Sequence, residues 1–257
     1  MRDRGLDEAI RAVGGVSELA RRIGISQPSV SNWDRVPAER ISAVEAATGV
    51  ARAVLRPDLF ELSGTPSVDP IDAARAAEYA LLATLLARGP DADLLKRLSR
   101  LAGDETLLGV AHSELAAAAT RTNAKDVERE YFDLFIGVGR GELLPYASYY
   151  LTGFLNERPL ARVRGDLQDI GVEKAQGQSE PEDHVAILFE VMSALTSGAH
   201  QAPLGTDRDF FRKHIAPWVP RFFADLERNR CADFYVRVGA LGRVFMDIET
   251  EAFALPS

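Results

Sequence analysis

The sequence predicts an all-α protein in which a small helix-turn-helix domain is followed by a larger all-helical bundle. Apolar residues recur at helical spacing along most of the chain, and no segment alternates apolar and polar residues long enough to predict a sheet. Residues 63–70 contain two prolines and one glycine, which cannot continue a helix and therefore separate two helical regions. Charged residues also follow different patterns on the two sides of this segment.

Charge divides the chain at the same place. Residues 1–64 contain nine arginines, nine acidic residues and no lysine, so their net charge is zero. The whole net charge of −8 therefore lies in the remainder of the chain. A length of 257 residues is enough for two domains that each bury a core. We therefore predict a helix-turn-helix domain over residues 1–62, a linker over residues 63–70 and a helical bundle over residues 71–257.

Four short helices are expected in the first domain. Gly14, Gly24 and Gly49 each follow an apolar stretch and suit the left-handed position beyond a helix end. Ser26 is a good N-cap, and Pro37 suits a first helical turn. The expected helices cover residues 6–13, 16–23, 27–33 and 37–48.

Longer helices are expected in the second domain. Leucines recur at helical spacing in residues 71–88 and 92–101, and Asn123 can cap a helix over residues 125–135. A stretch rich in glycine and proline, residues 137–145, interrupts this pattern and predicts one long central loop. The remaining expected helices cover residues 105–120, 160–170, 181–197, 207–215, 219–227 and 232–252. Such a pattern is typical of a compact helical bundle.

Residues 16–33 have the pattern of a helix-turn-helix motif. Ala20 allows the second helix to cross closely, and Gly24 suits the turn. The apolar seam between the helices is formed by Leu19, Ile23, Ile25, Val30 and Trp33. With this seam facing inward, the polar side chains that face outward are Gln27, Ser29, Ser31 and Asn32. Gln and Asn bond the edge of adenine, and Ser reaches bases or phosphates.

Three arginines flank this polar face and are candidates for phosphate contacts: Arg21, Arg22 and Arg35. Residues 6–60, including the ending at residues 55–60, resemble the YdaS/Cro-like helix-turn-helix family of phage and antitoxin-type regulators. The resemblance implies that the domain binds DNA as a homodimer. The alternative is a motif used only for packing or protein contacts, because zero net charge weakens the electrostatic attraction to DNA. We favour DNA binding and expect it to require dimerisation.

Two separated motifs stand out in the second domain. The first comprises residues 130–135 (EYFDLF) and 144–150 (LPYASYY), and the second is residues 180–184 (EPEDH), before an apolar helix. Together with an aromatic-rich tail over residues 210–223 and 234–238, they resemble the TorD/DmsD/NarJ family of redox-enzyme maturation chaperones. The resemblance covers residue 70 to the C-terminus and implies an all-helical, TorD-like bundle.

The resemblance implies binding of the N-terminal or twin-arginine signal segment of a molybdopterin oxidoreductase apo-subunit, held until its cofactor is inserted. Formate dehydrogenase is one client class that it suggests. Carried over onto the two motifs, the candidate client-peptide-binding residues are Tyr131, Phe135, Pro145, Tyr146, Ser148, Tyr149, Glu180, Pro181, Asp183 and His184. The loop at residues 136–141 departs from the family, in which many members carry a proline, and this leaves the loop shape and client choice open.

The chemistry of these residues allows two interpretations. Asp183 and His184 can bind the backbone amides or arginines of a peptide through charge-assisted bonds, and tyrosines beside a loop suit a groove. Alternatively, Pro181 and the acids after it start a helix, which is the role expected of Glu182. At least one of three aromatic side chains at helical spacing is expected in the core: Tyr131, Phe132 and Phe135.

No pattern in the sequence predicts catalysis or a cofactor. Cys231 is the single cysteine, which excludes an internal disulfide and a cysteine-rich zinc site, and the four histidines never fall at metal-ligand spacing. The glycine-rich segment 137–141 is no dinucleotide fingerprint, because Glu142 takes the place of the third glycine. We therefore expect no enzymatic activity, no cofactor and no metal.

The N-terminus is charged and amphipathic, unlike a signal peptide, and no apolar run approaches the roughly 20 residues that span a bilayer. We therefore expect a soluble, cytoplasmic protein. Two functions stay open: a maturation chaperone with a fused DNA-binding module, or a transcriptional regulator that uses its bundle as a peptide or subunit sensor. A third, a pure interaction protein, is disfavoured by the polar face around Gln27 and Asn32.

Overall fold

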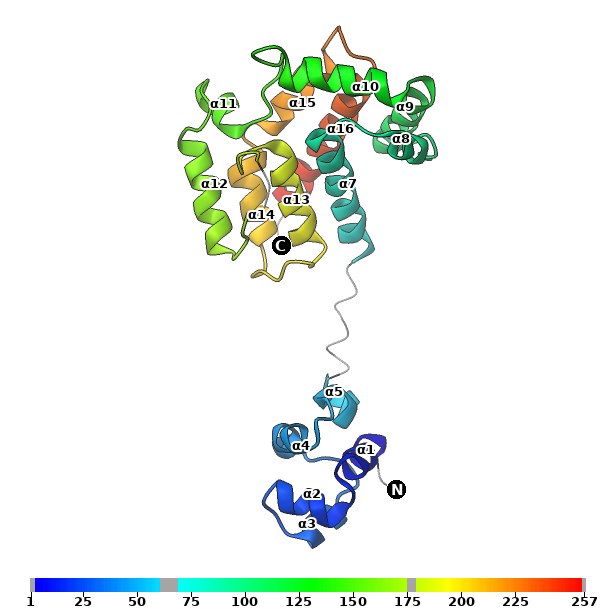
Figure 1. Cartoon of the computed structure of the whole chain (residues 1–257), viewed down its shortest axis with the longest axis vertical. Helices are drawn as coiled ribbons and strands as arrows, with labels where there is room; N and C mark the ends of the chain where they lie inside the picture. The colour runs from blue at the N-terminus through cyan, green and yellow to red at the C-terminus, as the bar shows by residue number, and fades with distance from the viewer. Residues whose placement is uncertain (1–2, 61–68, 175–178, 256–257) are drawn as a thin grey trace. The chain divides into compact units, whose positions relative to one another are not determined.

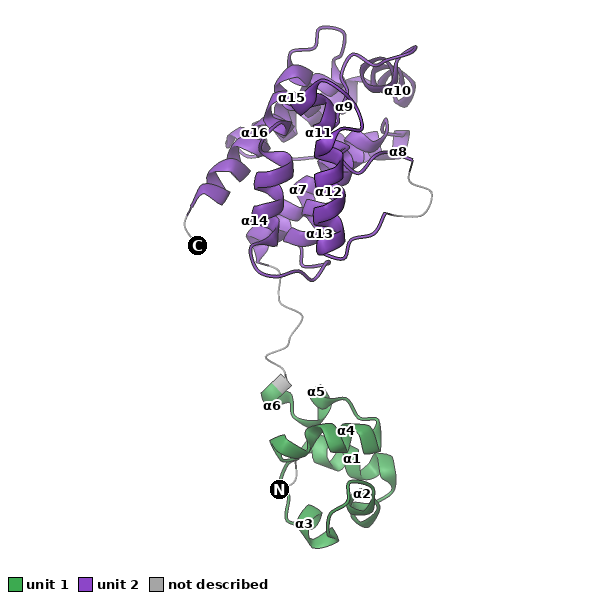
Figure 2. Ribbon diagram, turned by 90° about the vertical axis from the view of Figure 1, so that its left-hand side faces the viewer, with its two compact units in different colours: residues 1–67 green, residues 68–257 purple. Residues whose placement is uncertain are grey.

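The chain divides into two compact units, Met1–Ser67 and Val68–Ser257 (Figures 1 and 2). The structure is a computed structural model that describes residues 3–60, 69–174 and 179–255. All regular elements in these ranges are helical, so the predicted all-α class is confirmed. No helix among them is both long enough and apolar enough to cross a membrane. The predicted linker, residues 63–70, lies outside the described residues except for its last two.

Unit 1 is built from short helices around one small core. Its elements are α1 (Arg4–Val13), α2 (Val16–Arg22), α3 (Gln27–Ser31), the 3-10 turn η1 (Ala38–Arg40), α4 (Ile41–Thr48), α5 (Arg52–Leu55) and α6 (Pro57–Phe60). Ser26 caps α3 as predicted, because its hydroxyl accepts the backbone N–H of Ser29 at 3.4 Å. Gly24 adopts a φ of 70° in the turn between α2 and α3, which suits glycine.

The predicted seam of the helix-turn-helix motif is confirmed. Leu19 and Val30 are fully buried, and three further apolar side chains pack partly buried against the same core: Ile23, Ile25 and Trp33. Because these side chains occupy the inner faces of α2 and α3, the polar side chains of α3 are left on the outside.

Unit 2 is a bundle of longer helices, in which α7 packs along α13 and α15 packs along α16 (Figure 1). Its elements are α7 (Pro70–Ala87), α8 (Ala92–Leu98), α9 (Leu107–Arg121), α10 (Ala124–Tyr131), the π-helical turn η3 (Phe132–Ile136), α11 (Ala147–Thr152), α12 (Arg158–Asp169), α13 (Val185–Thr196), α14 (Thr206–Phe210), the π-helical turn η4 (Phe211–Ile215), α15 (Val219–Glu227) and α16 (Phe234–Ala254). Large aromatic side chains fill the core, among them Tyr79, Phe189, Trp218, Phe222 and Phe223.

Two features of unit 2 differ from the sequence prediction. The short helix α11 was not predicted, because it ends after six residues at Gly153 and shows too little periodicity. The helix expected over residues 181–197 begins only at Val185. The cause is tertiary: the backbone N–H of Val185 donates to the carbonyl of Pro145 at 2.9 Å, and that of Ala147 to the carbonyl of Asp183 at 3.0 Å. This pairing keeps residues 183 and 184 outside the helix.

Candidate functional site

The two motifs of unit 2 lie side by side, although about 35 residues separate them in sequence. Tyr146 and His184 form an isolated antiparallel bridge, and their rings meet edge to face with centroids 5.0 Å apart. The hydroxyl of Tyr146 also donates to a carboxylate oxygen of Glu180. The fold therefore brings Pro145, Tyr146 and Ser148 of the first motif to the second motif, at the starts of α11 and α13.

Asp183 is completely buried and holds the first turn of α11. Its Oδ2 accepts the backbone N–H of Ser148 at 2.8 Å, so it satisfies a helix-start donor that α11 leaves unpaired. Its Oδ1 and the buried hydroxyl of Ser148 have no hydrogen-bond partner among the described atoms. Charge-assisted bonds between Asp183 and a client stay a prediction; in the structure the buried carboxylate positions α11.

His184 is likewise buried, and its Nδ1 accepts the backbone N–H of Ala186 at 3.1 Å. It is thus the N-cap of α13, the role that the sequence suggested for the residues around Pro181. Burial lowers the pKa of His184 to about 4, against the smaller opposing influence of Glu180 and Asp183. The imidazole is therefore neutral near pH 7, and client binding by His184 stays a prediction.

The side chains of this region that remain accessible belong to other candidates. Glu180 is exposed, and Tyr146 and Pro181 are half-buried. Burial, followed by the bond to Glu180, raises the pKa of Tyr146 above its ordinary value, so its hydroxyl stays a donor. Tyr149 is also half-buried, and the Arg140 guanidinium lies 4.9 Å from its ring centroid and donates to its hydroxyl.

The aromatic side chains of α10 and η3 differ in how deeply they are buried. Phe135 belongs to the core and meets Tyr235 edge to face at 5.4 Å, which confirms that at least one of the three predicted aromatics is buried. The hydroxyl of Tyr131 donates to the carbonyl of Ala87 at 3.0 Å, and burial together with nearby Glu180 raises its pKa to about 12. Phe132 is instead 41% exposed.

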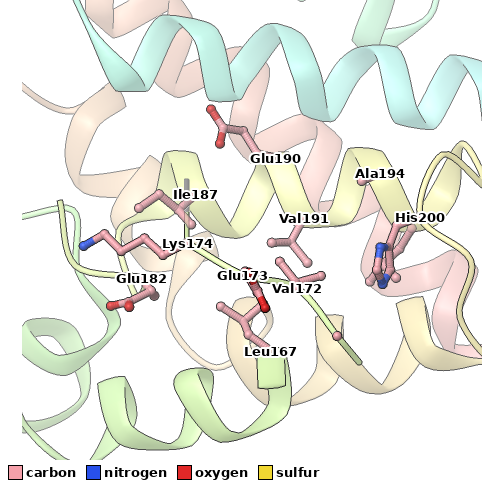
Figure 3. A pocket seen from close by; sticks show the side chains of 12 residues that line it. Leu167, Val172, Glu173, Lys174, Glu182, Ile187, Glu190, Val191, Ala194 and His200 are labelled. Carbon is pink, nitrogen blue, oxygen red and sulfur yellow. The ribbon is translucent and has the colours of Figure 1, made fainter. Parts of the chain in front are cut away.

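A pocket of about 340 Å³ lies beside the second motif, and no sequence pattern predicted it (Figure 3). Its residues come from the end of α12, the segment after it, Glu182, one face of α13 and the segment after α13: Leu167, Gly171, Val172, Glu173, Lys174, Glu182, Ile187, Glu190, Val191, Ala194, Leu195 and His200. Leu167, Val172 and Val191 face one another across it. The i, i+4 spacing of Ile187 and Val191 is a sequence signal that could have indicated this face of α13.

Acidic side chains border the apolar part of this pocket. Glu182 does not start a helix as predicted but pairs with Arg164, whose Nη2 lies 2.8 Å from Oε2. Although burial acts in the opposite direction, this pair holds the pKa of Glu182 below its ordinary value. Burial raises the pKa of Glu190, which makes no ion pair with any described cation. Glu190 and the exposed Glu173 therefore remain available to a cationic ligand.

In unit 1, the structure exposes most of the predicted DNA-facing side chains of α3. Gln27, Ser29 and Asn32 are exposed, while Ser31 is half-buried and accepts from the amide of Gln27 at 3.3 Å. The flanking arginines all have carboxylate partners, which sequence reasoning missed. Arg21 and Arg22 both bond Glu18, and Arg35 lies 3.3 Å from Asp58.

Within residues 3–60, 69–174 and 179–255, no three His, Cys, Asp or Glu side chains gather as a metal site would require.

Residues 102–224 match the family described as nitrate reductase delta subunit, and residues 6–62 match the family described as bacterial toxin YdaS. A redox enzyme maturation protein from Archaeoglobus fulgidus is similar in structure, with a TM-score of 0.46 and 23% identity, over 66% of this chain and 93% of that one.

Chaperone protein TorD of Vibrio cholerae is 32% identical over 162 residues, which cover 58% of this chain and 71% of the relative. Its counterpart from Vibrio atlanticus is 26% identical over 171 residues, which cover 61% of this chain and 80% of the relative. Both resemblances predicted from the motifs are confirmed by these matches. The chain therefore belongs to the TorD family of chaperone proteins.

Proposed function

We propose that this protein is a cytoplasmic chaperone, not an enzyme, that binds the N-terminal or signal segment of a molybdopterin oxidoreductase apo-subunit during its maturation. The observation that carries the proposal is the pocket beside Glu180–His184, with an apolar interior and the acids Glu173 and Glu190 at its border. A segment that is basic and then apolar complements such a site, because its cations meet carboxylates while its apolar part leaves water. Formate dehydrogenase is the client class to examine first.

The test measures binding of the full chain to a peptide that copies the N-terminal segment of a molybdopterin oxidoreductase from the same host. Reversing both border charges, in Glu173→Lys/Glu190→Lys, is expected to weaken the affinity roughly tenfold, or about 1.4 kcal/mol. The matched control is Glu105→Lys/Glu251→Lys, which changes the net charge equally at two exposed acids outside the pocket. Equal affinities of the two double variants would contradict the proposal.

A second function is supported by unit 1, which we propose binds double-stranded DNA as a homodimer. The supporting observation is the exposed polar surface of α3, formed by Gln27, Ser29 and Asn32, within a helix-turn-helix that matches the YdaS family. Gln27→Ala/Asn32→Ala is expected to abolish discrimination between a selected operator and random DNA, because these amides would read base edges. Unchanged discrimination would contradict base reading by α3.

The two functions combine in two ways. In the first, the chaperone carries a DNA-binding module that links the amount of client to transcription. In the second, the protein is a regulator, and its bundle senses a peptide or subunit. Only the regulator requires that client binding change the affinity for the operator, and linkage then requires DNA to change client affinity by the same factor.

A further inference from the structure

Glu18 occupies both arginines that precede the turn of the helix-turn-helix. Its Oε2 accepts from Nε of Arg21 at 2.9 Å, and its Oε1 accepts from Nη2 of Arg21 at 2.6 Å. The same Oε1 accepts from Nε of Arg22 at 2.9 Å. The carboxylate of Glu18 thus forms a bidentate pair of hydrogen bonds with the guanidinium of Arg21 and one hydrogen bond with that of Arg22. Guanidinium groups bind phosphates in the same bidentate geometry.

The spacing along α2 explains this arrangement. Glu18 precedes Arg21 by three residues and Arg22 by four, so all three side chains share one exposed side of the helix. Arg22 is held further by the carbonyl of Ala47, which accepts from its Nη1 at 3.1 Å. The bonds to Arg21 and then Arg22 lower the pKa of Glu18 to about 2, so the carboxylate is ionised throughout the physiological range.

The consequence for a DNA ligand is a competition at Arg21 and Arg22. A phosphate that approaches them must displace a carboxylate that is always charged. Phosphate contacts supply most non-specific affinity, whereas base contacts supply specificity. A helix-turn-helix whose cations are already paired therefore loses affinity for random DNA more than it loses discrimination between sequences.

We propose that Glu18 is a specificity-determining residue of unit 1, which keeps Arg21 and Arg22 from phosphates so that binding depends on the base contacts of α3. This inference rests on the proposed DNA-binding function. A carboxylate on α2 then limits non-specific binding, a role opposite to that of the arginines beside it.

The experiment compares the full-length wild-type protein with Glu18→Gln by fluorescence anisotropy, on a random-sequence DNA duplex and on an operator selected from a random pool. Glu18→Gln is expected to bind random DNA more tightly, with a plot of log affinity against log salt steeper by about 0.9 for each of Arg21 and Arg22 that gains a phosphate contact. Because the gain applies to every sequence, the ratio of operator to random affinity is expected to fall.

The matched control is Glu45→Gln. Oε2 of Glu45 accepts from Nη2 of Arg52 at 2.7 Å, in an exposed pair of the same unit that lies outside residues 16–33. Replacing Glu45 by Gln changes the net charge by the same amount as Glu18→Gln. Adding both Arg21→Gln and Arg22→Gln to Glu18→Gln is expected to return the affinity and salt slope to the wild-type values, because both released cations are then removed. Both results together locate the effect at Glu18 and its two arginine partners.

Three outcomes overturn the inference and separate it from the function on which it rests. If wild type and Glu18→Gln bind random DNA with equal affinity and equal slope, Glu18 limits nothing, and DNA binding itself stands. If Glu45→Gln increases the affinity for random DNA as much as Glu18→Gln does, the increase comes from the net charge and not from the position of Glu18. If none of the variants binds any duplex, both the inference and the DNA-binding function fail.

Discussion

Asp183 and His184 are neighbours in sequence and both are buried, yet each serves a different helix. Asp183 accepts a backbone N–H of α11, and His184 accepts one of α13. A motif that looked like a pair of ligand-binding charges is therefore a junction that fixes the starts of two helices. Both helix starts border the region that holds the accessible candidates Tyr146, Tyr149 and Glu180.

Substitutions at Asp183 are expected to separate its hydrogen bond from its charge. Asp183→Ala leaves the N–H of Ser148 without a partner in a buried position, and is expected to lower the free energy of unfolding by about 1–3 kcal/mol. Asp183→Asn keeps an acceptor oxygen and is expected to cost less. Urea unfolding of both variants measures the difference, and equal losses would show that the charge matters more than the bond.

The buried His184 is expected to make stability depend on pH. Its pKa is about 4 in the folded state and about 6.5 when unfolded, so the unfolded chain binds the additional proton between these values. The free energy of unfolding is therefore highest above pH 6.5 and falls as pH decreases towards 4, by at most about 1.4 kcal/mol per unit from this group. In His184→Asn, which keeps a capping acceptor, that decrease is expected to be smaller.

The comparison uses urea unfolding of wild type and His184→Asn at pH 7 and pH 5. Differences between the two proteins remove the contributions of carboxylates and of the other histidines, which titrate in both. A wild-type loss of stability no larger than that of His184→Asn would show that His184 does not lose its proton on burial.

At the scale of elements, a buried ion pair joins the beginning of α7 to the end of α16. Glu249 is fully buried and accepts from Nε of Arg75 at 2.7 Å and from the hydroxyl of Tyr79 at 2.8 Å. Glu249→Ala leaves Arg75 with Asp72 at 2.8 Å and Asp207 at 4.0 Å, and leaves the hydroxyl of Tyr79 without this acceptor, so it is expected to cost about 1–3 kcal/mol. Arg243→Ala, which breaks the exposed pair with Glu227, is expected to cost under about 1 kcal/mol in the same unfolding assay.

Close packing of α15 on α16 gives a second test of the fold. A Cβ added at Gly239 would lie 2.5 Å from the backbone nitrogen of Glu227, so Gly239→Ala is expected to destabilise by about 1–3 kcal/mol. Gly165 lies inside α12 with open space around it, and Gly165→Ala is expected to stabilise by about 0.4–1 kcal/mol. Thermal unfolding checks both signs, and the same sign for both would contradict this packing.

The elements themselves were largely predictable where local signals decide them. Caps such as Ser26 and glycines such as Gly24 set helix ends through bonds and φ angles that depend on a few neighbouring residues. The start of α13 was not predictable from local signals, because Pro181 and two acids form a good helix start that a pairing with residues 145–147 overrides. Periodicity also failed for α11, which is too short to display it.

At the scale of the whole molecule, the two units carry different chemistry and are expected to bind their ligands through separate sites. Gln27→Ala/Asn32→Ala is expected to leave the affinity for the client peptide unchanged, and Glu173→Lys/Glu190→Lys to leave the affinity for DNA unchanged. Titration of each variant with each ligand measures this. A client peptide that alters operator affinity in the wild-type protein would instead favour the regulator.

The sequence by itself determined the all-α class, the division near residues 63–70 and the resemblances to the TorD and YdaS families. The class and the division rest on periodicity, charge distribution and helix caps, which are encoded locally, and the resemblances rest on the motif residues themselves. Only the tertiary structure decided that Asp183 and His184 face inward, that an acid-bordered pocket lies beside them, and that Glu182 pairs with Arg164. The physical reason is that burial, pKa and the partner of a charge depend on which segments the fold brings together.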